Sequence, residues 1–254
     1  MKLELFIRKI KDNLHKGGYY LEKYIINDGK KHPVAIICPG GAYRFVASFV
    51  EGLPYARWLN KRGYSAFVVH YACGKNAGYP APQRDVVRAI KEIAAHSEEW
   101  NLDMEGYSLW GASAGGHLAA SFGTNAMGYA LYDVPKPGAI ILSYPVISMG
   151  EKTHPLTREL LLGKNPAPEM VELASVEKQI TPDYPPTFVW CGLADQVVDP
   201  DNSRMMADAL RAAGVPHRFV AYDNVDHGVG LGEGLPCEGW IEKAVEFWEE
   251  QIAK

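Results

Sequence analysis

The sequence predicts an α/β fold in which a mostly parallel sheet of about eight strands carries helices on both faces. Short and nearly unbroken apolar runs recur along the chain, which is typical of parallel strands buried on both faces. Segments with helical apolar spacing separate these runs, so strands and helices alternate. The length of 254 residues suits one large domain of this class, and we expect residues 1–254 to form a single domain.

The first part of the chain begins with an ambiguous segment and then alternates regularly. Residues 2–14 fit a strand and a helical face equally well, so their structure stays open. Residues 19–26 favour a strand, and the apolar run of residues 33–38 predicts a second strand that is buried on both faces. A helix around Tyr55 is expected next, followed by a buried strand over residues 65–71.

The middle of the chain continues this pattern. Pro82 is well suited to the first turn of a helix, and the apolar spacing behind it predicts a helix to about residue 100. Residues 107–110 predict a buried strand, which leads into a helix that begins at Ser113. Residues 138–144 predict a further apolar strand.

Residues 145–184 interrupt the alternation. Prolines at residues 155, 166, 168 and 182 and only short helical pieces fall in this segment, so we expect a surface excursion that could cover a substrate. The alternation then resumes and runs to the end of the chain. The last predicted elements are a strand over residues 186–191, a helix over 201–213, a strand over 218–222 and a helix over 239–253.

Composition excludes several classes of partner. Hydrophobic residues make up 47% and charged residues 22% of the chain, and the formal net charge of -4 comes with no basic run, which argues against nucleic acid. Charges interrupt the apolar pairs of the first ten residues, and no apolar run reaches membrane-spanning length, so we expect neither a secretory signal nor a membrane anchor. The four cysteines lack metal-ligand spacing, which favours reduced thiols, a cytoplasmic location and no metal.

The motif Gly111-Ala112-Ser113-Ala114-Gly115 lies between the predicted strand and the predicted helix. Its glycines leave no Cβ to clash in a sharp turn, so the serine can be held in a strained conformation with its hydroxyl exposed. In a loop, the same five residues would more often form an ordinary turn. The order strand, turn, helix favours Ser113 as a nucleophile.

A serine nucleophile needs a general base, which is usually a histidine. His154 precedes the last two predicted core strands, and His217 enters a strand just after a proline. His227 instead follows the last strand, at the end of the sheet where ligands of α/β folds bind. We therefore expect His227 to be the base.

The base needs an acidic partner to orient it. The loop after the strand over residues 186–191 offers Asp195 and Asp199, with Asp201 expected to begin the next helix. Asp195 comes nearest to the end of the strand, whereas Asp199 precedes a proline and fits a turn. We favour Asp195, although an aspartate at this position could also form a simple Asx turn.

Acyl transfer also requires hydrogen-bond donors for the oxyanion. The backbone amide of Ala114 follows the nucleophile directly, and Gly40-Gly41-Ala42 after the first buried strand can supply a second donor. The paired glycines could instead form a tight turn or a phosphate loop, but both common phosphate-binding glycine motifs are absent.

Taken together, these motifs resemble those of the α/β-hydrolase superfamily, and more narrowly those of the small acetyl-xylan-esterase-like esterases related to the hormone-sensitive-lipase group. The motifs are Pro39-Gly40-Gly41-Ala42-Tyr43, Gly111-Ala112-Ser113-Ala114-Gly115-Gly116-His117, Gly192-Leu193-Ala194-Asp195-Gln196-Val197-Val198 and Asp226-His227-Gly228. The resemblance implies an α/β-hydrolase fold without a large cap domain and with no cofactor. It also implies Ser113 as nucleophile, Asp195 as acid and His227 as base, with an oxyanion hole formed by the amides of Gly41, Ala42 and Ala114.

The chain departs from the lipase-type pattern at two points. Pro39 and Ala42 replace the histidine and the third glycine of the usual His-Gly-Gly-Gly loop, and too few residues precede Gly40 for the helical cap of larger relatives. An open cleft would favour a short acyl group on a bulky alcohol, such as an acetylated sugar. Tyr43, Phe45, Tyr144 and Tyr184 are candidate cleft-lining residues and Glu51 a candidate for binding the alcohol, although these side chains could equally pack in the core or begin a helix.

These observations leave three candidate functions to be tested. The first is a serine carboxylesterase that removes short acyl groups, acetyl above all, from a small-molecule ester such as an acetylated oligosaccharide. The second is a serine peptidase of the prolyl-oligopeptidase kind, although the large filtering domain of those enzymes is absent from this sequence. The third is a hydrolase-fold binding module without catalysis. The sequence makes no prediction of an oligomeric state.

Overall fold

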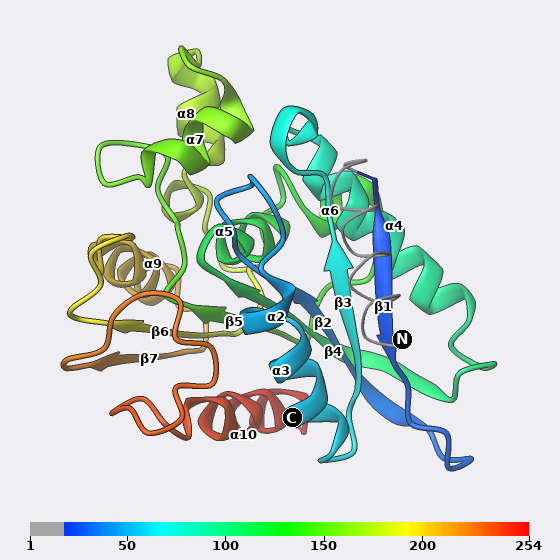
Figure 1. The fold of residues 1–254 in the computed structure, drawn as a ribbon. Coiled ribbons are helices and arrows are strands. Elements are labelled where there is room, and N and C mark those ends of the chain that lie inside the picture. The colour runs from blue at the N-terminus through cyan, green and yellow to red at the C-terminus, as the bar shows by residue number, and fades with distance from the viewer. Residues whose placement is uncertain (1–17, 254) are drawn as a thin grey trace, which may run out of the picture.

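A seven-stranded sheet organises the computed structural model, which describes residues 18–253. The ambiguous residues 2–14 lie outside this range. The strands are β1 (Tyr20–Tyr24), β2 (His32–Cys38), β3 (Ser65–His70), β4 (Leu102–Ala112), β5 (Ala139–Ser143), β6 (Thr187–Gly192) and β7 (His217–Tyr222). They lie in the order β1-β3-β2-β4-β5-β6-β7, and only β1 runs antiparallel to its neighbour (Figure 1). The predicted mostly parallel sheet is confirmed, with seven strands in the described residues.

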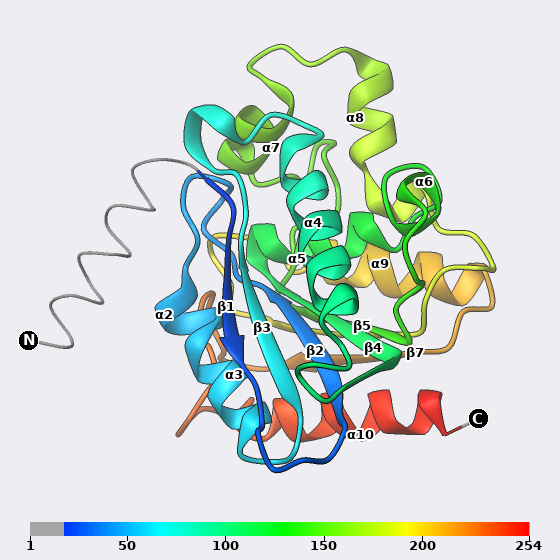
Figure 2. The same ribbon diagram turned by 90° about the vertical axis from the view of Figure 1, so that its right-hand side faces the viewer.

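Helices cover both faces of the sheet. They are α2 (Ser48–Glu51), α3 (Leu53–Asn60), α4 (Ala81–Ala95), α5 (Ser113–Phe122), α6 (Tyr129–Tyr132), α7 (Pro155–Leu162), α8 (Pro168–Ala174), α9 (Asp201–Ala212) and α10 (Trp240–Ile252), with short 3-10 turns at η1 (Gly74–Asn76) and η2 (Val176–Lys178). Figure 2 shows α3 and α10 on one face, and α4, α5 and α9 on the other. No helix among residues 18–253 is long and apolar enough to cross a bilayer.

Strand β2 shows why the apolar runs are unbroken. Val34 and Ile36 belong to the core beneath α4 and α5, whereas Ala35 and Ile37 belong to the core beneath α3 and α10. All four side chains are at most 1% exposed. Because successive residues of a strand point to opposite faces, a strand covered on both faces must be apolar at every position.

Helix α4 and strand β4 differ from their predicted lengths. The helix ends at Ala95, and residues 96–101 form turns instead of a further helical turn. Strand β4 begins at Leu102, five residues before its predicted start, because its first residues pair with β2. Polar side chains such as Asp103 and Glu105 hide this extension in the sequence, since they break the apolar run.

The strand order places a topological switch point between β2 and β4. The chain passes from β2 to β3 on one side and then returns to β4 on the other side of β2. At such a point the loops that follow the two strands diverge and leave a crevice at the carboxyl ends of the strands. Residues 39–47, here named the glycine loop, and the start of α5 therefore meet at this edge. Figure 1 shows α7 and α8, from residues 145–184, standing above the same end of the sheet.

Candidate active site

Ser113 occupies a strained turn between β4 and α5. Its φ of 53° lies in the left-handed region, which costs a non-glycine residue about 1–3 kcal/mol and persists only where the surroundings enforce it. The turn packs directly on the end of β2, where a Cβ added to Gly115 would lie 2.0 Å from the carbonyl oxygen of Cys38. This close approach explains why glycine is needed at residue 115. The side chain of Ser113 is thereby held at the carboxyl edge of the sheet.

His227 joins Ser113 to Asp195. Its Nε2 lies 2.9 Å from Oγ of Ser113, and its Nδ1 lies 2.7 Å from Oδ2 of Asp195. An ionised carboxylate can only accept hydrogen bonds, so Nδ1 carries the ring proton and donates it. In the neutral imidazole Nε2 is then an acceptor, and the Ser113 hydroxyl donates to it.

The loop after β6 holds Asp195 in place. Its Oδ1 accepts hydrogen bonds from the amides of Val197 and Val198, both at 2.9 Å, which leaves Oδ2 free for His227. Asp199, the alternative acid, instead pairs with Lys152 at 2.8 Å. The structure therefore brings Asp195, and not Asp199, to the histidine.

The other two histidines weighed as bases lie in different surroundings. His217 sits at the start of β7, where its Nδ1 is 2.9 Å from the carbonyl oxygen of Val215. His154 lines the cleft that contains Ser113, but its Nδ1 lies 2.9 Å from Oγ1 of Thr157. Burial and the nearby His227 lower the pKa of His154, which favours a neutral ring facing the cleft.

The glycine loop presents backbone amides beside Ser113. Gly41 and Ala42 have φ values of 119° and 56°, and a Cβ on Gly40 would lie 2.7 Å from Cβ of Ser113. Within residues 18–253, the amides of Gly41 and Ala42 have no hydrogen-bond acceptor. The amide of Ala114 belongs to the first turn of α5, where helical N–H groups lack an intrahelical partner. Unpaired donors from two elements thus flank the Ser113 hydroxyl.

An open cleft of about 310 Å³ surrounds these groups. Phe45 and Val197 are apolar side chains at its rim, 49% and 51% exposed. His154 and Leu156 reach the cleft from the excursion over residues 145–184, so this segment contributes to its wall. Sequence reasoning missed Leu156 at the start of α7 and Val197 in the loop after β6, because no local pattern shows that these side chains point into the cleft.

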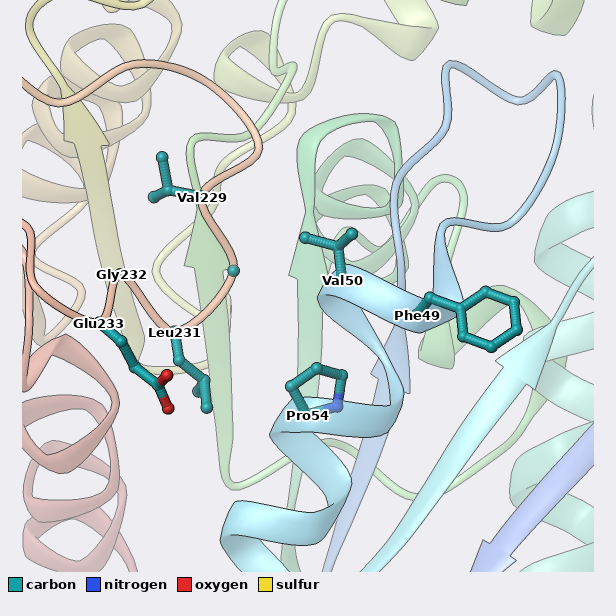
Figure 3. A pocket seen from close by; sticks show the side chains of 8 residues that line it. Phe49, Val50, Pro54, Val229, Leu231, Gly232 and Glu233 are labelled. Atoms are coloured by element: carbon teal, nitrogen blue, oxygen red, sulfur yellow. The ribbon is translucent and has the colours of Figure 1, made fainter. Parts of the chain in front are cut away.

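A second hollow of about 320 Å³ adjoins the first, and Val50 lines both. Figure 3 shows Val50 and Pro54 on one side and Val229 and Leu231 on the other, whereas the ring of Phe49 points away from this gap. The loop that forms the second wall directly follows His227 in the chain. The two hollows therefore share one rim.

Two predicted substrate contacts need correction. Tyr43 is fully buried, and its hydroxyl lies 3.0 Å from Nδ1 of His117. Tyr184 is 2% exposed, and its hydroxyl donates to the carbonyl oxygen of Ala120 at 2.7 Å. Both rings fill the core on the α5 face of the sheet and do not line the cleft.

Tyr144 and Glu51 lie nearer to the site. Tyr144, also predicted as a substrate contact, is 1% exposed and does not line the cleft. Its ring instead packs edge-on against His227 with the ring centroids 4.8 Å apart, so it supports the imidazole from behind. Glu51 is 3% exposed but contributes to the cleft lining, where its Oε2 accepts the amide of Gly40 at 2.7 Å. Burial raises the pKa of Glu51, and the Gly40 amide, the Tyr144 hydroxyl and His227 oppose that rise.

His117 links the glycine loop to the excursion. Its Nε2 lies 2.8 Å from the carbonyl oxygen of Ala174, which can only accept, so Nε2 carries the proton. Nδ1 then accepts from the hydroxyl of Tyr43. Burial lowers the pKa of His117 to about 4, so the ring is neutral at pH 7.

The potential metal ligands of residues 18–253 are dispersed. No three histidine, cysteine, aspartate or glutamate side chains in this range are grouped as a metal site. Cys38, Cys73, Cys191 and Cys237 are all free thiols.

The sheet, its helices and the crevice at the switch point define an α/β-hydrolase. The acetyl ester-xyloside bifunctional hydrolase of Caldicellulosiruptor lactoaceticus superposes with a TM-score of 0.83 at 34% identity, over 91% of this chain and 88% of that chain. The chain belongs to the BD-FAE family, whose model matches residues 21–210.

Two curated relatives are similar over most of this chain. The endo-1,4-beta-xylanase B of Butyrivibrio fibrisolvens is 33% identical over 92% of this chain and 40% of its own length. The acetylxylan esterase of Xylanibacter ruminicola is 31% identical over 84% of this chain and 44% of its own length. The chain thus spans less than half of either relative. The resemblance inferred from the motifs is confirmed: the chain is an acetyl-xylan-esterase-like α/β-hydrolase.

Proposed function

We propose that this chain is a serine carboxylesterase that removes short acyl groups, acetyl above all, from carbohydrate esters. The observation that carries the proposal is the hydrogen-bonded series from Ser113 through His227 to Asp195, set beside unpaired backbone amides in an open cleft. This is the arrangement that acyl transfer through a serine requires.

In the first half of the reaction, Ser113 Oγ attacks the ester carbonyl carbon while its proton passes to Nε2 of His227. The carbonyl electron pair moves onto the carbonyl oxygen, and the resulting oxyanion accepts hydrogen bonds from the amides of Gly41, Ala42 and Ala114. The intermediate collapses when the bond to the alcohol oxygen breaks, and this oxygen takes the proton from Nε2. The acyl group remains on Ser113.

In the second half, water attacks the acyl carbon and gives a proton to His227. A second oxyanion forms in the same place and collapses by breaking the bond to Ser113 Oγ, which recovers its proton from Nε2. The acid is released and the enzyme returns to its starting state. Throughout, Asp195 keeps the proton of the imidazole on Nδ1 and stabilises the imidazolium that forms in each half.

The cleft supports a small acyl group and a bulky alcohol. Its volume of about 310 Å³ is open at a rim that includes Phe45 and Val197, and we assign the excursion over residues 145–184 the role of a partial cover through His154 and Leu156. The names of the relatives, acetylxylan esterase and acetyl ester-xyloside bifunctional hydrolase, support an acetylated xylo-oligosaccharide as the ester. We further propose that residues 1–254 fold as one domain.

Turnover of 4-nitrophenyl acetate by the purified chain tests the proposal. Ser113→Ala is expected to lower kcat on the order of 10⁴-fold or more, because it removes the nucleophile. Acetylated xylo- and manno-oligosaccharides, compared with 4-nitrophenyl esters of increasing acyl length, then rank the natural substrates. A wild-type chain that shows neither ester turnover nor labelling of Ser113 by a fluorophosphonate would be a binding module. Cleavage of a proline-containing amide in preference to esters would favour the peptidase.

A further inference from the structure

The buried carboxylate of Glu51 has no part in the hydrogen-bonded series of Ser113, His227 and Asp195. It nevertheless lines the same cleft while being only 3% exposed. A buried carboxylate is costly unless polar partners compensate for lost hydration. Its immediate surroundings therefore indicate what it contributes to this site.

The first partner of Glu51 is one peptide unit of the glycine loop. The amide of Gly40 donates to Glu51 Oε2 at 2.7 Å, and the carbonyl oxygen of Pro39 accepts from the Tyr71 hydroxyl at 2.5 Å. These two groups belong to the same planar peptide, so it is held from both sides. Because Gly41 and Ala42 follow directly, the orientation of this peptide sets the direction in which their amides point.

The loop that Glu51 holds also touches the nucleophile. A Cβ on Gly40 would lie 2.7 Å from both Glu51 Oε2 and Ser113 Cβ. This spacing leaves no room for the loop to approach further. A loop that lost its bond to Glu51 could only move away from Ser113, carrying the amides of Gly41 and Ala42 with it.

The second partner of Glu51 is the hydroxyl of Tyr144. Burial raises the pKa of Glu51, and this hydroxyl opposes the rise, as the Gly40 amide does. Tyr144 is itself 1% exposed, and its ring packs against that of His227. Both polar partners of the carboxylate are therefore fixed groups of the site.

We propose that Glu51 is a positioning residue: it fixes the amides of the glycine loop toward Ser113. The inference rests on the proposed function, since the direction of these amides matters only if an oxyanion forms. It replaces the expectation that Glu51 binds the alcohol part of the substrate.

Two substitutions test the hydrogen bond from Glu51 to the glycine loop. Glu51→Gln keeps an oxygen that can accept the Gly40 amide, whereas Glu51→Ala removes the acceptor. With 4-nitrophenyl acetate we expect kcat of Glu51→Gln to stay within about threefold of the wild type. In Glu51→Ala we expect a fall of about 10²-fold, because the oxyanion donors are displaced.

Rescue by the conservative variant supplies a readout that a purely structural role would not move. The kcat lost in Glu51→Ala should be recovered in Glu51→Gln, while the KM of both variants stays near the wild-type value. Glu246→Gln is the matched control, since Glu246 is an exposed carboxylate on α10. It should leave kcat and KM as in the wild type.

The outcomes distinguish the inference from the proposed function. Absence of turnover by the wild type is a failure of the proposed function, whereas the ratios of variant to wild type test Glu51. If Glu51→Ala kept the wild-type kcat, or if kcat fell as far in Glu51→Gln as in Glu51→Ala, the inference would be overturned. Should Glu51→Ala fail to fold, Glu51→Asp takes its place. Its shorter side chain withdraws the carboxylate from the Gly40 amide, so kcat should fall while KM changes little, and an unchanged kcat would overturn the inference.

Discussion

Asp195→Asn is expected to invert the proton arrangement of the proposed catalytic site while preserving its shape. Oδ1 of Asp195 accepts two backbone amides, from Val197 and Val198, at 2.9 Å each. In the asparagine the amide oxygen must take this position, because an NH₂ group there would face two donors. The NH₂ group then points at Nδ1 of His227, which has to accept. The ring proton therefore moves to Nε2, which donates to Ser113 instead of accepting its proton.

The expected loss of kcat is about 10⁴-fold, as for a triad histidine held in the wrong tautomer, which corresponds to about 5 kcal/mol of transition-state stabilisation. The assay is hydrolysis of 4-nitrophenyl acetate, with the rate of fluorophosphonate labelling at Ser113 as a second measure of nucleophilicity. Asp199→Asn is the control, because Asp199 pairs with Lys152 on the surface and should leave kcat unchanged. A kcat within threefold of the wild type in Asp195→Asn, roughly a difference of 0.7 kcal/mol, would refute the reasoning.

Three further predictions concern stability and pH. Gly115→Ala should destabilise the fold by about 1–3 kcal/mol or more in urea titrations, because its Cβ would meet the backbone of Cys38 at 2.0 Å; an unchanged midpoint would contradict this. Burial lowers the pKa of His117 to about 4 in the folded chain, so on acidification the unfolded chain binds a proton on this ring before the folded chain does. The free energy of unfolding should therefore fall by about 3 kcal/mol as the pH drops from about 6.5 to 4. In His117→Gln that contribution should vanish from the pH dependence of unfolding. The side chain of Asn202 accepts hydrogen bonds from two backbone amides and donates to two backbone carbonyls. Asn202→Ala should therefore lower the free energy of unfolding by about 2–4 kcal/mol and speed limited proteolysis within residues 145–184. Equal digestion rates of variant and wild type would contradict this.

The fold was predictable because its elements carry strong local patterns. Strand β2 alternates between two cores, which forces an unbroken apolar run that is visible in the sequence. The turn at Ser113 was predictable for a similar reason, since glycines on both sides permit the close contact with β2. Where pairing with a neighbour overrides local composition, as at Leu102 and Asp103 at the start of β4, the prediction of the strand was too short.

Side-chain direction in loops was not predictable from the sequence. Tyr43 and Tyr184 are aromatic residues near strand ends, like many cleft residues, but both point into the core and bond to α5. Their burial depends on partners distant in the chain, His117 and Ala120, which no local pattern reveals. The proximity of Ser113, His227 and Asp195 follows from chain order and strand ends, whereas their catalytic roles stay predictions.

The link through His117 has a consequence for engineering this protein. Its ring is hydrogen-bonded to Tyr43 of the glycine loop on one side and to the main chain of Ala174 in α8 on the other. A change within residues 145–184 that moves Ala174 would therefore also move His117 and the glycine loop, whose amides lie beside Ser113. In the proposed esterase, variants that keep the backbone of Ala174 in place would alter the wall of the cleft without displacing these amides.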